Sequence, residues 1–237
     1  MMKNKMSGGI MVMIMLGLLA QTTTAREELK TEQIQLQKDT ARFQSYIPKH
    51  HSLFSAVHGD LNKDGLEDTV LIVKAADPKK VVRNRFDEVV DRNRRGIIVL
   101  LGQKNKTAYQ TFIKNLNCFS SDQEDGGVYF APELSSEIKN GILELHYGHG
   151  RYGYWGYKFR IEHNDMRLIG YDHSSNHGPM VESFTSLNFI TGKKLYKDNI
   201  NKMNPEQPER FKETWSNIQI APIYLSKIKD FDEISFE

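Results

Sequence analysis

The chain has 237 residues, enough for one large domain or two small ones, and its 32 basic residues nearly balance its 30 acidic residues. Proteins that neutralise many phosphates need a basic surplus or a clear basic face, so this composition argues against a nucleic-acid partner. Cys118 is the only cysteine, which excludes an internal disulfide.

Residues 1–25 have the features of a secretory signal peptide. Lys3 and Lys5 form a basic start, Ile10 to Ala20 is an apolar run, and the segment ends at the small residue Ala25. The run is shorter than the roughly 20 apolar residues of a membrane-spanning helix. We therefore expect cleavage after Ala25, a periplasmic or secreted protein, and no membrane span in the mature chain.

The segment 26–45 is charged and rich in glutamine. Leu29, Leu36 and Phe43 recur at seven-residue intervals, which predicts a short, weakly amphipathic helix. We expect the main β domain at 46–202. Beyond it, 203–237 is interpreted as a C-terminal tail that adds edge strands at 218–225 and 234–236.

An Asx-rich stretch between two apolar segments has the spacing of a calcium loop. Oxygen-bearing side chains stand at loop positions 1, 3, 5 and 9, namely Asp60, Asn62, Asp64 and Asp68. Gly65 at position 6 allows a positive φ, which turns the carbonyl of Leu66 inward as a further ligand. Calcium prefers roughly six to eight oxygen ligands, so we expect Ca²⁺ here. The alternative is a metal-free surface turn, because Asn, Asp and Gly are also the usual turn residues.

Position 12 of the loop is Leu71 and not the bidentate Glu of an EF-hand, which excludes that motif. The pattern D-x-N-x-D-G-x-x-D before an apolar strand resembles the FG-GAP loops of integrin-like repeats, in which Asp68 takes the place of the missing Glu. From about residue 46 to 194 the chain resembles exported bacterial proteins of uncharacterised function with a single FG-GAP-like (VCBS-type) loop. The landmarks are 47–49, 59–65, 91–96, Gly126-Gly127, 157–160 and 168–171. The resemblance implies a periplasmic or extracellular location and calcium binding, without implying a reaction.

Two continuous apolar runs, Val70 to Val73 and Ile97 to Leu101, favour strands that are covered on both faces. Between them, 77–95 is rich in charge and is interpreted as an exposed insertion with at most a short helical turn. Further strand segments are predicted at 109–113, 142–147, 157–161, 166–171 and 186–190.

Asn164-Asp165 and Thr191-Gly192 are predicted to close hairpins between these strands. The calcium-loop pattern occurs once, which excludes a propeller made of such loops. We therefore expect a single, mainly β domain with an antiparallel, sandwich-like sheet arrangement and a short N-terminal helix.

The stretch 147–159 combines glycines with aromatic residues, and Tyr152, Tyr154 and Trp155 are candidate ligand-binding residues that could stack on a sugar. The alternation of Trp155, Tyr157 and Phe159 indicates instead a core strand with these three rings on one face. Core packing is the favoured interpretation, and the ligand platform is the alternative.

No catalytic residue is assigned. His146 and His149 should face opposite sides of a strand, and 173–177 is interpreted as a loop, so the histidines do not have the spacing of a zinc site. No G-x-S-x-G elbow is present, and Cys118 has no nucleophile signature beside it.

These features predict an exported, non-catalytic calcium-binding β protein that binds an envelope component or a partner protein. The alternative is an envelope polysaccharide or peptidoglycan hydrolase, or a glycan-binding module, that uses the aromatic stretch 147–159.

Overall fold

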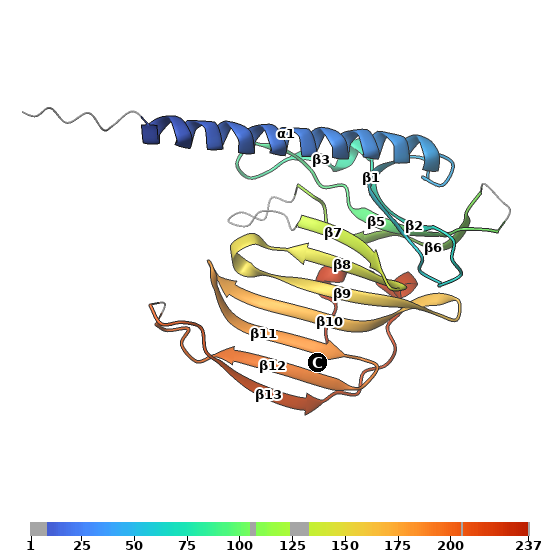
Figure 1. Cartoon of the computed structure of the whole chain (residues 1–237). Coiled ribbons are helices and arrows are strands. Elements are labelled where there is room, and N and C mark those ends of the chain that lie inside the picture. Colours follow the sequence, from blue (N-terminus) through green and yellow to red (C-terminus); the bar gives the residue numbers. More distant parts are fainter. Residues whose placement is uncertain (1–8, 105–107, 124–132, 205, 237) are drawn as a thin grey trace, which may run out of the picture. The chain divides into compact units, whose positions relative to one another are not determined.

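The computed structural model describes residues 9–104, 108–123, 133–204 and 206–236, with side chains from Arg26 onward (Figure 1). It divides into two compact units, 1–45 and 46–237. The expected fold class is confirmed, because the chain is mainly β, its sheets are antiparallel, and the one α-helix of the described residues lies near the N-terminus.

Helix α1 (Gly9–Phe43) is longer than the helix expected at 26–45 and begins inside the segment interpreted as a signal peptide. Thr31 and Thr40 each donate a hydroxyl hydrogen bond to the carbonyl four residues earlier, Glu27 and Leu36 respectively. Within the part of the chain that the structure describes, no helix combines the length and the apolar character needed to cross a membrane. Cleavage after Ala25 stays a prediction.

A four-stranded sheet begins the larger unit, in the order β1-β2-β5-β6. Its strands are β1 (His51–Gly59), β2 (Asp68–Ala75), β5 (Arg95–Leu101) and β6 (Gln110–Phe119). All residues of β2 up to Val73 and of β5 up to Leu100 are buried. The prediction that these two apolar runs form strands buried on both faces is therefore confirmed.

The insertion between β2 and β5 is a hairpin. A 3-10 turn, η1 (Pro78–Lys80), leads into β3 (Val81–Arg83), which pairs with β4 (Val89–Asp91). Most of its side chains are exposed. The prediction of an exposed insertion is confirmed for most of the segment, but the short helical turn that Phe86, Val89 and Val90 suggested is not formed, because Val89 and Val90 belong to β4. The hairpin itself was not expected.

A seven-stranded sheet follows as a meander in which each strand pairs with the next one along the chain. Its strands are β7 (Glu133–Lys139), β8 (Ile142–Gly148), β9 (Gly153–Glu162), β10 (Asp165–His177), β11 (Met180–Asn188), β12 (Lys193–Asn199) and β13 (Phe211–Asn217). Both predicted hairpins are present, β9–β10 and β11–β12. The loop interpretation of 173–177 is wrong, because these residues continue β10 and pair with β11. Gly126-Gly127 lies outside the described residues.

The two sheets share one core. Val70 and Ile97 of the small sheet belong to the same buried cluster as Leu145, Tyr157 and Met166 of the large sheet. This supports the expected sandwich-like arrangement, in which two sheets pack their apolar faces together.

The C-terminal tail contributes to this core, and the edge strands expected at 218–225 and 234–236 are not formed. Only an isolated bridge joins Tyr224 to Arg167, and 3-10 turns η3 (Leu225–Lys227) and η4 (Phe231–Glu233) follow. Phe231 is buried and stacks on Phe119 with ring centroids 4.6 Å apart. The tail (Figure 1, red) packs its buried apolar residues into the core that the two sheets share, and these residues do not extend a sheet edge.

Candidate cation-binding loop

The loop 60–67 connects β1 to β2, whose last pair is Gly59 with Asp68. Two of its residues have left-handed backbone, Lys63 with φ 61° and Gly65 with φ 82°. Such a conformation costs a residue with a Cβ more than it costs glycine. The side chain of Leu61 is buried in the core, so the loop is fixed at its beginning.

Asp60, Asn62 and Asp64 are brought together around one turn. The N–H of Asp64 donates to Asp60 Oδ1 at 3.2 Å and to Asn62 Oδ1 at 3.0 Å. The N–H of Gly65 donates to Asp60 Oδ2 at 2.9 Å, and the N–H of Leu66 donates to Asp64 Oδ1 at 2.8 Å. The side-chain amide of Asn62 donates to Asp64 Oδ2 at 2.9 Å. The loop thus holds its own oxygen atoms in place through its backbone.

This donor set fits a hard cation. An ionised carboxylate has about four acceptor sites, and each of Asp60 and Asp64 uses two in the bonds above. Both side chains therefore keep acceptor capacity on a turn that is exposed to solvent. Within the described residues, no group of three or more His, Cys, Asp or Glu side chains is gathered as a metal site. A site here would therefore depend on the amide of Asn62 and on backbone oxygen as well as on carboxylates.

The carboxylate of Asp68 joins the loop to the small sheet. Its fully buried carboxylate accepts N–H bonds from Leu61 at 2.8 Å and Asn62 at 3.3 Å on Oδ2, and from Gly102 at 2.9 Å on Oδ1. Burial raises the pKa of Asp68, and the three backbone N–H groups only partly oppose that rise. Asp68 therefore ties the start of the loop to the end of β5.

The loop lies where the two sheets meet. A Cβ at Gly59 would be 2.6 Å from Ile138 Cγ2 of β7, so glycine permits the close approach of β1 and β7. The turn between β7 and β8 also reaches the loop, because a Cβ at Gly141 would be 2.5 Å from Lys63 Cε and 3.3 Å from the carbonyl oxygen of Leu61. The loop is therefore in contact with elements of both sheets, and a change in its conformation would disturb both.

The three aromatic candidates do not share one surface. Trp155 packs on the core, where its ring is 3.8 Å from that of His149, and its neighbours Tyr157 and Phe159 are buried on the same face. Tyr154 projects from the opposite face of the sheet and contacts His146, with ring centroids 4.8 Å apart. Tyr152 lies in the 3-10 turn η2 (Gly150–Tyr152) and is exposed. The structure therefore divides these rings between two faces and a turn.

Two buried polar atoms near Trp155 have no hydrogen-bond partner within the described residues, its own Nε1 and Nε2 of His149. Desolvation lowers the pKa of His149, with further lowering by His173 and His146, and desolvation also lowers the pKa of His173. Burial raises the pKa of the Cys118 thiol to about 12, which disfavours the reactive thiolate.

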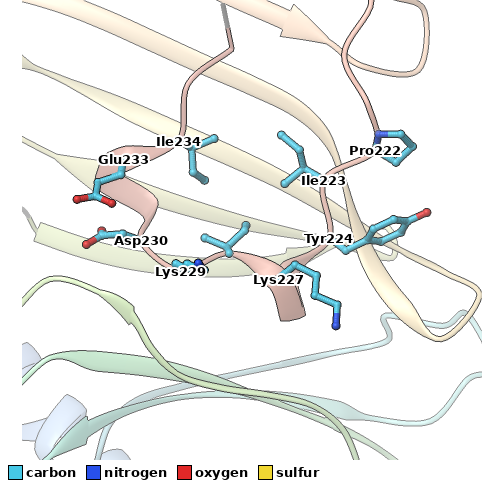
Figure 2. Close-up of a pocket in the computed structure, with 9 residues that line it drawn as sticks. Pro222, Ile223, Tyr224, Lys227, Lys229, Asp230, Glu233 and Ile234 are labelled. Carbon is cyan, nitrogen blue, oxygen red and sulfur yellow. The ribbon is translucent and has the colours of Figure 1, made fainter.

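The C-terminal tail encloses an open hollow of about 430 Å³ (Figure 2). Its lining combines the apolar residues Ile223, Ile228 and Ile234 with charged side chains that include Asp230. Asp230 is already paired with Arg94 at 2.6 Å.

Sequence reasoning missed Gly102 and the buried hydrogen bonds that join Asp68 to the backbone of the loop and to the residue after β5. A Cβ at Gly102 would lie 2.6 Å from the carbonyl oxygen of Glu67, so only glycine lets β5 end against the loop. A glycine directly after a buried strand is the signal that could have indicated this close approach.

No known family model matches this chain, and no curated protein or solved structure is similar to it.

Proposed function

We propose that this protein is an exported, non-catalytic β protein that binds Ca²⁺ in the loop 60–68. The ligands in this proposal are the side chains of Asp60, Asn62, Asp64 and Asp68 and the carbonyl oxygen of Leu66. The observation that supports it most is the convergence of three oxygen-bearing side chains on the turn at Asp64, with acceptor sites left over. The export features of residues 1–25 support a periplasmic or secreted location.

The ion would act as a structural brace. The loop contacts the β7–β8 turn and is tied to β5, so a cation that holds the loop closed also holds the junction of the two sheets. The biological role that follows is binding of an envelope component or a partner protein by the braced β domain. Its partner is unidentified.

Calcium titration and thermal unfolding of the full chain test this proposal. Extracellular calcium modules bind at about 10⁻⁴–10⁻³ M, so millimolar Ca²⁺ should add about 1 kcal/mol to the free energy of unfolding. For a domain of this size, that corresponds to about 2–4 °C between calcium and chelator. Asp64→Asn should remove most of this difference, because it replaces a ligand carboxylate with a neutral amide.

Asp198→Asn is the matched control, since Asp198 is a partly exposed carboxylate on β12 that pairs with Lys202 at 2.7 Å. This variant should keep the full calcium response. Identical melting curves in calcium and in chelator, together with no heat of Ca²⁺ binding, would overturn the proposal. Equal loss of the response in both variants would show general charge screening and no defined site.

The alternative function, a glycan hydrolase or glycan-binding module at 147–159, has weaker support. It needs Tyr152, Tyr154 and Trp155 as one wall, but Tyr154 and Trp155 project from opposite faces of β9. What supports this alternative is Tyr154, which lies beside His146 on the face away from the core and could contact a sugar there.

A further inference from the structure

The β3–β4 hairpin (Figure 1) is fixed at its base, independently of the candidate cation-binding loop 60–67, which is called the cation loop below. Lys74 Nζ forms ion pairs with Asp91 at 2.8 Å and with Asp122 at 2.6 Å. Asn93 is buried and exchanges two hydrogen bonds with the backbone of Asp77, at 2.9 and 3.0 Å. The end of the hairpin is therefore held out from an ordered base.

The acidic residues of the hairpin are occupied locally. Asp87 pairs with Arg83 at 3.1 Å, and Glu88 accepts a hydrogen bond from the side-chain amide of Asn84 at 3.1 Å. Asn84 Oδ1 in turn accepts the N–H groups of Phe86 and Glu88, which closes the turn. Asp87 and Glu88 are thus engaged by Arg83 and Asn84.

Lys79, Lys80 and Arg85 are exposed and have no acidic partner within the described residues. Beside them three apolar side chains face water, with 46% of Val81, 59% of Phe86 and 62% of Val89 exposed. Val81 and Val89 lie on the same face of the hairpin by register. The guanidinium of Arg85 lies 4.7 Å from the ring centre of Phe86. The name hairpin surface is used below for these six residues, Lys79, Lys80, Val81, Arg85, Phe86 and Val89.

We propose that the hairpin surface docks the protein onto an anionic lipid surface. Exposed cations are attracted to anionic head groups with little demand on shape, and an aromatic or aliphatic side chain can enter the boundary between head groups and acyl chains. A stable protein interface needs about 800 Å² from each partner, whereas this surface consists of one short hairpin. The combination of three unpaired cations with three exposed apolar side chains on that hairpin favours lipid.

A fluorescent probe on the hairpin tests this. Cys118 is fully buried, so Val89→Cys creates the one accessible thiol of the full chain for an environment-sensitive dye. Added vesicles of phosphatidylglycerol and phosphatidylcholine should shift the emission of this dye to the blue, and phosphatidylcholine vesicles should not. A chelator in all samples prevents divalent ions from bridging protein and phosphate, so that this test does not depend on calcium binding.

Replacing Lys79, Lys80 and Arg85 together by Gln should weaken partitioning, measured by lipid titration of the dye, on the order of 100-fold, from about five-fold for each cation. Added salt should weaken it in the unaltered hairpin as well. Ile190→Cys, in the exposed turn between β11 and β12, is the control site for the same dye and should show no shift.

Two results would overturn the proposal. The first is no shift at position 89 with anionic vesicles, which would leave the surface to an acidic protein partner. The second is an equal shift at positions 89 and 190, or with both vesicle types, which would show contact of the chain with lipid that does not involve the hairpin surface.

Discussion

The cation loop and the β3–β4 hairpin are both short connections between strands of the small sheet, but their polar side chains are arranged in opposite ways. In the loop, the carboxylates of Asp60 and Asp64 turn inward onto backbone N–H groups, and Leu61 is buried beneath them. In the hairpin, acidic side chains pair with their near neighbours, while basic and apolar side chains such as Arg85 and Phe86 face solvent.

The difference shows that two connections of the same sheet can suit different ligands. Which ligand each one suits depends on its side chains and on where it is anchored. A loop that satisfies its own backbone with carboxylate oxygens is suited to a small cation held within the chain, because the oxygens are already gathered. A hairpin whose order comes from its base leaves its outer side chains available to a large surface. Each prediction below alters one side of this comparison.

The largest effect is expected from Asp68→Ala. This change leaves the N–H groups of Leu61, Asn62 and Gly102 without their acceptor, at least one of them in the buried interior. Hydrogen bonds to a charged group contribute more than neutral ones, and buried unpaired donors are costly, so the free energy of unfolding should fall by about 3 kcal/mol. Urea unfolding measures it.

The matched change on the hairpin is Glu88→Ala, which removes an exposed carboxylate that has a side-chain hydrogen bond to Asn84. It should alter the free energy of unfolding by no more than about 0.5 kcal/mol. If the two variants lost similar stability, the loop would be no better anchored than the hairpin, and the comparison would fail.

A smaller effect is expected from Gly65→Ala. An added Cβ would meet no atom within 4 Å, so the cost comes only from the left-handed backbone at φ 82°. That cost is about 1 kcal/mol. Lys63→Gly, at φ 61°, should move stability the other way by a smaller amount, because it relieves the same conformation but loosens the unfolded chain. Destabilisation by both changes in urea unfolding would contradict this explanation.

The gathering of the loop oxygens could be predicted from the sequence because the hydrogen bonds that hold Asp60, Asn62 and Asp64 in the turn join residues no more than five apart. The hydrogen bond from the N–H of Gly102 to Asp68 could not, since its partners are 34 residues apart and meet only when β2 pairs with β5. Spacing alone identifies a local turn, and the sheet determines which of its residues are buried.

The same limit explains the strands that were missed. β7 contains only two apolar side chains, Leu134 and Ile138, and β12 is rich in lysine, so neither has a strong strand pattern. Both form strands because their backbones pair with a neighbouring strand, β7 with β8 and β12 with β11. In the tail the opposite happened, because apolar residues such as Leu225 and Ile234 suggested edge strands but pack in or against the core.

The smallest expected effect is the loss of stability at low pH that comes from Asp91, at the root of the β3–β4 hairpin. Burial acts to raise the pKa of Asp91, but hydrogen bonds from Lys74 and Asn93 outweigh it and hold that pKa below its ordinary value of 3.8. Because the folded chain binds this proton more weakly than the unfolded chain, the contribution of Asp91 to stability is complete above 3.8 and is lost as the pH falls through the folded pKa. The pair is partly exposed, so this contribution should be below about 1 kcal/mol.

Carboxyl-carbon NMR titration of Asp91 measures this pKa directly, and Lys74→Met should raise it. Amide hydrogen exchange in the hairpin should also become faster in that variant, while exchange in the cation loop should be unchanged, since Lys74 is at the far end of β2 from the loop. A pKa of 3.8 or above in the unaltered chain would show that the ion pair does not hold the base. The ordered base on which the exposed hairpin surface depends would then have to come from the buried amide of Asn93 and from the pair of Lys74 with Asp122.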